Sequence, residues 1–152
     1  MGIDSRQAAF AGVLLLANRM QTTYDAALDG VTLKQWLAIT VVAHLPQPVA
    51  STAAVARALG TTHQNVRKLL GALADKGLVH LTPSAHDARA REVHLTPAAR
   101  AFFEREEATG ARLLDELFAD VAPADLAACL RVLDAMSRSL TGEPLTPRDE
   151  EA

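Results

Sequence analysis

The 152-residue chain has one cysteine, few aromatic residues and no long apolar run. The single Cys129 excludes an internal disulfide framework and is typical of a reducing compartment. Aromatic residues make up 4% of the chain although 49% is hydrophobic, a mixture that favours packed helices over a β-sandwich. The longest apolar run, residues 37–45, is too short to span a bilayer, and no secretory signal is visible. We therefore expect one cytoplasmic domain over residues 1–152, with no membrane contact.

Motifs of catalysis are also missing from the sequence. We find no Ser–His–Asp spacing, no glycine-rich phosphate loop and no pair of carboxylates in an apolar setting. The chain is therefore not expected to be an enzyme or to need a cofactor.

Acidic and basic residues are unevenly distributed along the chain, whose net charge is −3. Residues 1–56 are neutral overall, residues 57–100 carry +4 and four of the five histidines, and residues 101–152 carry −7. Because DNA phosphates attract Lys and Arg, any contact with a nucleic acid would be confined to the basic middle of the chain.

Hydrophobic spacing predicts six helices and one β-hairpin. The helices are predicted over residues 5–28, 32–45, 52–59, 63–76, 97–120 and 123–140. Thr32 with Gln35 three residues later is the pattern of a capping box at the start of the second helix. Residues 78–82 and 91–95 alternate between apolar and polar, which predicts the two strands of a hairpin. The polar tail, residues 142–152, is expected to be flexible.

The order of these elements within residues 51–96 predicts a winged helix-turn-helix. Two short helices meet at Gly60, and in this motif the second helix enters the major groove of DNA. Six inward positions would hold the two helices together: Val55, Leu59, Val66, Leu69, Leu70 and Leu73. The predicted fold is mostly α with a small β-hairpin wing.

The outward side of the second helix is polar, and no acidic residue occurs from Gly60 to Ala74. Asn and Gln can pair with adenine, Arg with guanine, and Lys with phosphate. Counting the cap Ser51 of the first helix, the predicted DNA contacts are Ser51, Thr62, His63, Gln64, Asn65, Arg67 and Lys68. The alternative is a solvated surface helix, which would contain more Glu and Asp.

The loop and exit of the hairpin contribute Asp87, Arg89 and Arg91. A basic loop beside a recognition helix can reach the minor groove. We expect the carboxylate of Asp87 to hold the Arg89 guanidinium in one geometry. The alternative is a mobile hairpin with incidental arginines.

Two other features of the sequence are interpreted as structural. His80 and His94 are expected to face each other across the hairpin, with His86 in its loop, but zinc needs three or four ligands and nearby carboxylates are few. Cys129 is expected to be a buried apolar residue rather than an oxidant sensor. Neither feature predicts a metal or redox site.

These motifs resemble those of the MarR family of regulators. The matching pieces are Leu59-Gly60, Lys76-Gly77-Leu78-Val79, Asp87-Ala88-Arg89 and Leu95-Thr96, together with the helix entry from Thr32 to Trp36. The resemblance extends in helix order over residues 5–141. It implies a homodimer whose first and last helices interleave, with Arg89 in the minor groove and Asp87 helping to fix it.

The division of the chain that follows is a winged-helix portion, residues 31–96, between dimerisation helices at 5–30 and 97–141. Apart from the resemblance, the apolar stripes of residues 10–28 and 113–140 exceed what one small winged helix can cover, so they indicate a partner surface. A two-fold dimer predicts an inverted-repeat operator with half-sites about one helical turn apart.

The resemblance also implies a cleft for small, often aromatic or phenolic effectors between the dimer helices and the winged helix. Met20, Tyr24, Trp36 and His44 would border it, and the alternative is that all four are ordinary core and boundary residues. The leading hypothesis is a sequence-specific regulator of double-stranded DNA, most often a repressor in that family. The alternatives are a winged-helix protein–protein interaction module and a chromatin-type binder without sequence preference.

Overall fold

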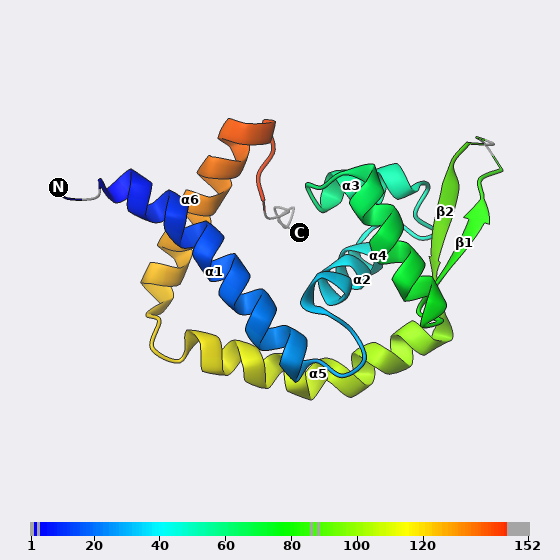
Figure 1. Cartoon of the computed structure of the whole chain (residues 1–152), viewed down its shortest axis with the longest axis horizontal. Helices are drawn as coiled ribbons and strands as arrows, with labels where there is room; N and C mark the ends of the chain where they lie inside the picture. The colour runs from blue at the N-terminus through cyan, green and yellow to red at the C-terminus, as the bar shows by residue number, and fades with distance from the viewer. Residues whose placement is uncertain (1, 3, 86, 88, 146–152) are drawn as a thin grey trace, which may run out of the picture. The chain divides into compact units, whose positions relative to one another are not determined.

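A computed structural model describes residues 2, 4–85, 87 and 89–145 of the chain. His86 and residues 146–152 of the tail, about which the sequence made predictions, lie outside the described residues. The described residues form α1 (Ser5–Ala27), α2 (Leu33–His44), α3 (Thr52–Ala58), α4 (His63–Asp75), β1 (Val79–Pro83), β2 (Arg91–Leu95), α5 (Pro97–Phe118) and α6 (Pro123–Thr141) (Figure 1). The predicted mostly α fold with one hairpin is confirmed.

The chain divides into two compact units, residues 1–109 and residues 110–152. The first unit contains α1 to β2 and the first part of α5. The second contains the rest of α5 and α6. The division predicted from the sequence, with dimerisation helices on either side of residues 31–96, stays a prediction.

Short polar side chains set the beginnings of the helices in the first unit. Thr32 Oγ1 accepts from the backbone N–H of Gln35 at 3.2 Å, and Gln35 Oε1 accepts from the N–H of Thr32 at 3.2 Å. This reciprocal pair is a capping box, and it confirms Thr32 as the predicted cap of α2. Ser51 Oγ accepts from the N–H of Ala54 at 3.2 Å and caps α3. Each cap satisfies an amide that the helix itself leaves unpaired.

The core of the first unit lies between α2, α3, α4 and the hairpin. Its largest fully buried side chains are Ile39, Val42, Val55, Val66, Leu70, Leu73 and Val93. On α4 the buried residues follow one another at steps of four and three, so one face of this amphipathic helix packs inward. Of the six predicted inward positions, Leu59 and Leu69 are only half-buried.

The hairpin is antiparallel, with His80 opposite His94. The two rings lie 6.5 Å apart between centroids, which confirms that they face each other. The described residues contain no group of three metal-ligating side chains. Val49, from the loop before α3, pairs with Val93 through two backbone hydrogen bonds of 2.9 Å and ties that loop to the wing.

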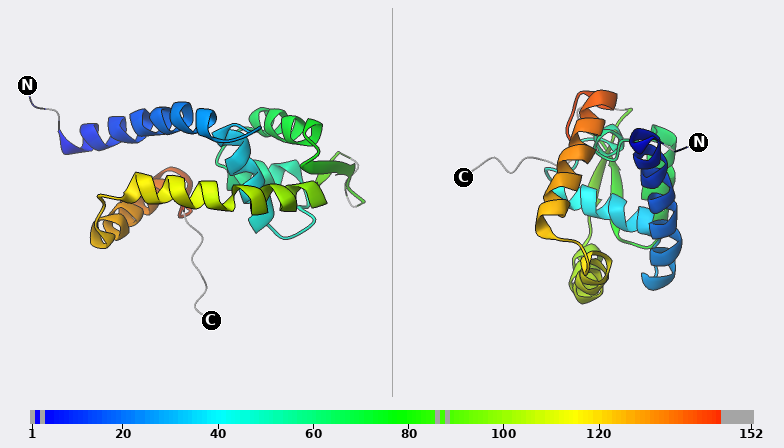
Figure 2. Two further views of the ribbon diagram at one scale, coloured as in Figure 1. Left: turned by 90° about the horizontal axis from the view of Figure 1, so that it is seen from below. Right: turned by 90° about the vertical axis from the view of Figure 1, so that its left-hand side faces the viewer.

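The end of α1 is tied to the winged helix by two polar contacts. Asp25 Oδ1 accepts from the N–H of Leu33 at 2.6 Å, and Lys76 Nζ donates to the carbonyl of Gly30 at 2.5 Å. Within this unit, α1 and the hairpin lie at opposite ends (Figures 1 and 2). Beyond the end of α1, Gly30 has a φ of +74°, in the left-handed region that glycine adopts readily.

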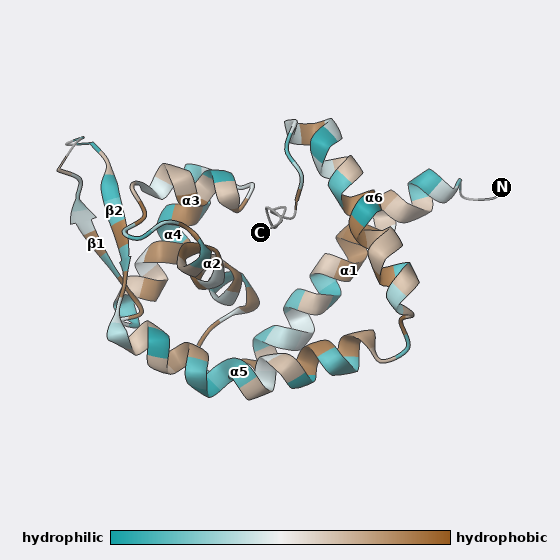
Figure 3. Cartoon of the chain, turned by 180° about the vertical axis from the view of Figure 1, so that it is seen from behind, coloured by the Kyte–Doolittle hydropathy of each residue, from teal (hydrophilic) through white to brown (hydrophobic). Residues whose placement is uncertain are grey.

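Both α1 and α6, each taken by itself, contain exposed apolar residues. The hydrophobic positions of each helix are brown in Figure 3. Neither helix has a buried residue in the described structure. Cys129 on α6 is exposed, so the prediction of a buried cysteine is wrong for the single chain. The physical reason is that the second unit offers α6 only part of one other helix to pack against. None of the described helices is both long and apolar enough to cross a membrane.

Candidate nucleic-acid interface

The predicted recognition surface is the outward side of α4. His63, Gln64, Asn65, Arg67 and Lys68 are all exposed in the described structure. The same helix buries its opposite face in the core, so the inward residues fix the direction of the polar side chains. The sequence therefore places a polar surface without carboxylates on a rigidly packed helix.

Thr62 and Ser51 are used by the chain as helix caps. Thr62 Oγ1 accepts from the N–H of Asn65 at 3.2 Å. Ser51, the cap at the start of α3, is half-buried. Because each hydroxyl accepts in its cap, its own O–H remains available to donate. Both residues can therefore donate to a phosphate oxygen without giving up the cap.

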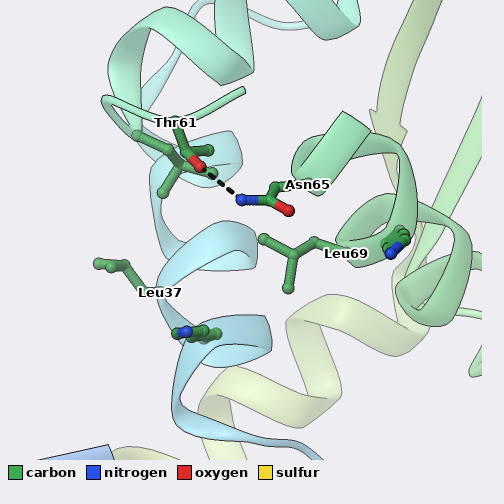
Figure 4. A pocket seen from close by; sticks show the side chains of 7 residues that line it. Leu37, Thr61, Asn65 and Leu69 are labelled. Atoms are coloured by element: carbon green, nitrogen blue, oxygen red, sulfur yellow. Dashed lines mark hydrogen bonds between the residues drawn. The ribbon is translucent and has the colours of Figure 1, made fainter. Parts of the chain in front are cut away.

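Asn65 lies at the edge of the polar surface. Its Nδ2 donates to Thr61 Oγ1 at 3.1 Å, which holds the carboxamide beside the turn between α3 and α4 (Figure 4). The side chains of Gln64, Arg67 and Lys68 have no hydrogen-bond partner within the described part of the chain. Asn65 is thus oriented by the fold, whereas its three neighbours are free to adapt to a partner.

The wing differs from its prediction in one respect. Asp87 Oδ1 accepts from the backbone N–H of Arg89 at 2.8 Å, and the Asp87 carbonyl accepts from the N–H of Ala90 at 2.9 Å. Among the described ion pairs, none joins Asp87 to the Arg89 guanidinium. A short Asp side chain reaches the amide two residues on, as in an Asx turn, so the carboxylate shapes the loop. Arg89 and Arg91 are exposed.

The four residues predicted to border an effector cleft lie on two helices of the first unit. Met20 and Tyr24, one turn apart on α1, are half-buried. Trp36 is half-buried against the core, and His44 is exposed with its Nδ1 2.8 Å from the carbonyl oxygen of Thr40. Their role in binding an effector stays a prediction.

A cavity of about 340 Å³ opens beside the polar surface, and no local pattern in the sequence predicts it. Its lining comes from α2, the end of α3, the turn and α4: Lys34, Leu37, Leu59, Thr61, Asn65, Lys68 and Leu69 (Figure 4). Lys34 and Leu37 precede α4 by more than 25 residues, so only the packing of α2 against α4 brings them here.

A comparison with protein families gives a match over the winged-helix part of the chain. The model described as the MarR family matches residues 29–90, which include α2, α3, α4 and β1. Residues 29–90, which contain most of the winged helix, are thus similar to the MarR family. The match ends within the wing loop, so it contains Ser51, Thr62 to Lys68, Asp87 and Arg89 but not Arg91. A comparison with curated proteins gave no match.

Solved structures are similar to this chain over more than the residues that the family model matches. A MarR/EmrR family transcriptional regulator from Acinetobacter sp. ADP1 has a TM-score of 0.77 at 17% identity, covering 92% of this chain and 99% of its own. The PcaV transcriptional regulator of Streptomyces coelicolor, solved with its natural ligand, has a TM-score of 0.78 at 14% identity, with coverage of 92% and 99%. MepR of S. aureus, solved with DNA, has a TM-score of 0.73 at 19% identity, with coverage of 91% and 97%. These likenesses, which cover 91–92% of this chain, show that it has the fold of these regulators.

Proposed function

We propose that this protein is a cytoplasmic, sequence-specific DNA-binding transcriptional regulator. The observation that carries the proposal is the exposed outward side of α4, which bears amides and cations, lacks carboxylates and belongs to a winged helix similar to the MarR family. Amides and Arg can read base edges in the major groove, and Lys and Arg can neutralise phosphates. In support, MepR, which shares the fold, was solved as a complex with DNA.

The exposed apolar residues of α1 support a homodimer. Phe10, Leu14, Leu15 and Leu16 are between 52% and 64% exposed, and no residue of α1 is buried in the described structure. Large apolar side chains exposed to this extent are unfavourable in water, and a two-fold symmetric copy is the commonest way to cover them. In a dimer the two copies of α4 would meet an inverted-repeat operator.

The second part of the proposal concerns whether the protein represses or activates transcription. We infer a repressor whose affinity for the operator a small ligand lowers by favouring a different separation of the two recognition helices. Such a ligand must bind one separation more tightly than the other, because equal binding shifts nothing. PcaV, solved with its natural ligand, supports the capacity of this fold for effectors.

The proposal is tested by titrating the protein against fragments of its own genome. Binding is followed by gel shift or by the anisotropy of labelled DNA at about 50 and 200 mM salt, where phosphate contacts lose affinity steeply. We expect a few fragments to be retained selectively and all affinities to fall with salt. Equal retention of every fragment would indicate a chromatin-type binder. Retention of none would indicate a protein-interaction module and overturn the proposal.

A further inference from the structure

Two consecutive threonines hold Asn65 at the start of α4. The backbone N–H of Asn65 donates to Thr62 Oγ1 at 3.2 Å, and its side-chain Nδ2 donates to Thr61 Oγ1 at 3.1 Å (Figure 4). Thr62 is the cap of the helix, whereas Thr61 precedes that cap and is not among the residues predicted to contact DNA. The bond to Thr61 therefore orients a side chain that helix formation alone leaves free to rotate.

The position of Thr61 is set by the end of α3. Its own N–H donates to the carbonyl of Ala56 at 3.1 Å, and the N–H of Gly60 donates to the carbonyl of Arg57 at 3.1 Å. With Gly60 at a φ of +61°, these two bonds form a Schellman motif, which closes a helix on a left-handed residue. Thr is also β-branched, so its χ1 angle has few allowed values. The hydroxyl that accepts from Asn65 is thus placed by α3 and not by α4.

The surroundings of this hydrogen bond are partly apolar. Thr61 is half-buried, and Thr61 and Asn65 line the cavity together with Leu59 and Leu69. A hydrogen bond beside apolar side chains is stronger than one surrounded by water, because the local dielectric constant is lower. We therefore expect the bond to persist in solution without DNA.

The anchored carboxamide presents one donor and one acceptor in a fixed order. Asn has two N–H donors and one carbonyl oxygen, and Thr61 takes one donor, which leaves Oδ1 beside the second N–H. This pair complements adenine, which presents N6–H and N7 in the major groove. Rotation of the carboxamide by half a turn exchanges its oxygen and nitrogen and reverses the order. An Asn65 side chain without the anchor would adopt both orders, whereas Thr61 favours one.

We propose that Thr61 is a positioning residue that determines which base Asn65 reads, and that the base selected is adenine. This inference rests on the proposed function, since it concerns how α4 reads DNA. Thr61 acts through Asn65, so it contributes to discrimination between bases and not to the general attraction for phosphates.

The role of Thr61 is tested by selecting bound sequences from a pool of random DNA duplexes with the full chain and its variants. Asn65→Ala identifies the base position that Asn65 reads, because the base preference there is lost. At that position Thr61→Val, which has nearly the same shape but no hydroxyl, should reduce the preference for adenine about three- to tenfold. Thr61→Ser keeps the hydroxyl and should stay within about twofold of the wild-type chain. A preference of the wild-type chain for another base at that position overturns the assignment of adenine.

A matched control is Thr40→Val, in the same winged helix. Thr40 Oγ1 on α2 is buried and has no hydrogen-bond partner among the described residues, so its removal breaks no bond. This variant should keep the base preferences of the wild-type chain. The double variant of Asn65→Ala with Thr61→Val should have the preferences of Asn65→Ala alone, because no side chain is left to position. A further loss in the double variant would show that Thr61→Val displaces α4, which overturns the positioning role.

The hydrogen bond itself is tested without DNA by NMR of the Asn65 side-chain amide. The bonded amide proton should exchange with water several-fold more slowly in the wild-type chain and in Thr61→Ser than in Thr61→Val. Equal exchange in all three proteins would show that Thr61 does not hold Asn65, and would overturn the inference.

The two proposals fail separately. If the wild-type chain selects no sequence from the pool, the sequence-specific regulator is overturned, while the exchange measurement still decides the bond between Thr61 and Asn65. If the wild-type chain selects a sequence and Thr61→Val keeps its adenine preference, the role of Thr61 is overturned and the regulator stands.

Discussion

Side chains on the outward side of α4 differ in whether a hydrogen bond within the chain orients them. Asn65 is anchored to Thr61, whereas Gln64, Arg67 and Lys68 have no hydrogen-bond partner among the described residues. Ordering a free long side chain on DNA costs rotamer entropy that an anchored amide has already lost. Base readout is therefore expected to depend most on Asn65, and the general attraction to DNA on Lys68.

Replacing these two residues separates the roles. Asn65→Ala should cost about 1–3 kcal/mol of discrimination at one base step. Lys68→Ala should weaken binding to all sequences alike and reduce the salt slope by about one. Both are measured by anisotropy on an operator and its single-base variants. If Asn65→Ala weakened every sequence equally, Asn65 would be a phosphate contact.

The wing loop offers a second prediction for a single residue. Because Asp87 accepts from a backbone amide, Asp87→Asn keeps an acceptor oxygen and should leave DNA affinity within about twofold, whereas Asp87→Ala should release the loop and weaken binding several-fold. Arg89→Ala is the reference, since it removes the proposed minor-groove contact while leaving the loop intact. A loss in Asp87→Asn as large as in Arg89→Ala would mean that the carboxylate acts through its charge on the guanidinium.

At the scale of elements, two glycines of the helix-turn-helix allow a matched test. A Cβ added at Gly60 or at Gly71 meets no atom within 4 Å, but Gly60 has a φ of +61° and Gly71 lies within α4. Gly60→Ala should cost about 1–2 kcal/mol because of the left-handed backbone. Gly71→Ala should stabilise α4 by about 0.5–1 kcal/mol. Urea unfolding measures both, and equal effects would contradict the backbone argument.

A structural element can be predicted from the sequence when the residues that determine it lie close together in the chain. The caps Thr32, Ser51 and Thr62 were predictable because each acts within three residues of its helix. The pairing of Val49 with Val93 joins residues far apart in the chain, and nothing local indicates it. The same holds for Lys34 and Leu37 in the cavity.

The candidate site was predictable in composition but not in geometry. Residue types alone indicated a DNA-facing helix and an arginine-bearing wing. The contact of Asp87 with a backbone amide depends on the conformation of a loop, which residue types do not specify. The exposure of Cys129 depends on what packs over α6, which only the three-dimensional arrangement decides.

At the scale of the whole molecule, the apolar surface of α1 predicts the oligomeric state. Leu15 is 57% exposed in the single chain, and in the proposed dimer Leu15→Glu would place a carboxylate in the interface. Burying an unpaired charge is strongly unfavourable, so the dimer should dissociate. Thr23→Glu, at an exposed polar position of the same helix, is the control.

Light scattering coupled to size-exclusion chromatography gives the mass of each variant. We expect the wild-type chain and Thr23→Glu to be dimers and Leu15→Glu to be a monomer that retains its helical circular dichroism. The monomer should also lose most of its affinity for a two-site operator, because each half-site would be bound alone. A dimer in all three variants would exclude α1 from the interface.

The scarcity of aromatic residues has a practical consequence for Trp36. It is the only tryptophan of the chain, it lies half-buried against the winged-helix core, and it directly precedes Leu37, which lines the cavity. All indole emission of the protein therefore originates on α2. The fluorescence emission of the unlabelled protein is therefore expected to shift to longer wavelength when the winged helix unfolds and Trp36 becomes exposed to water.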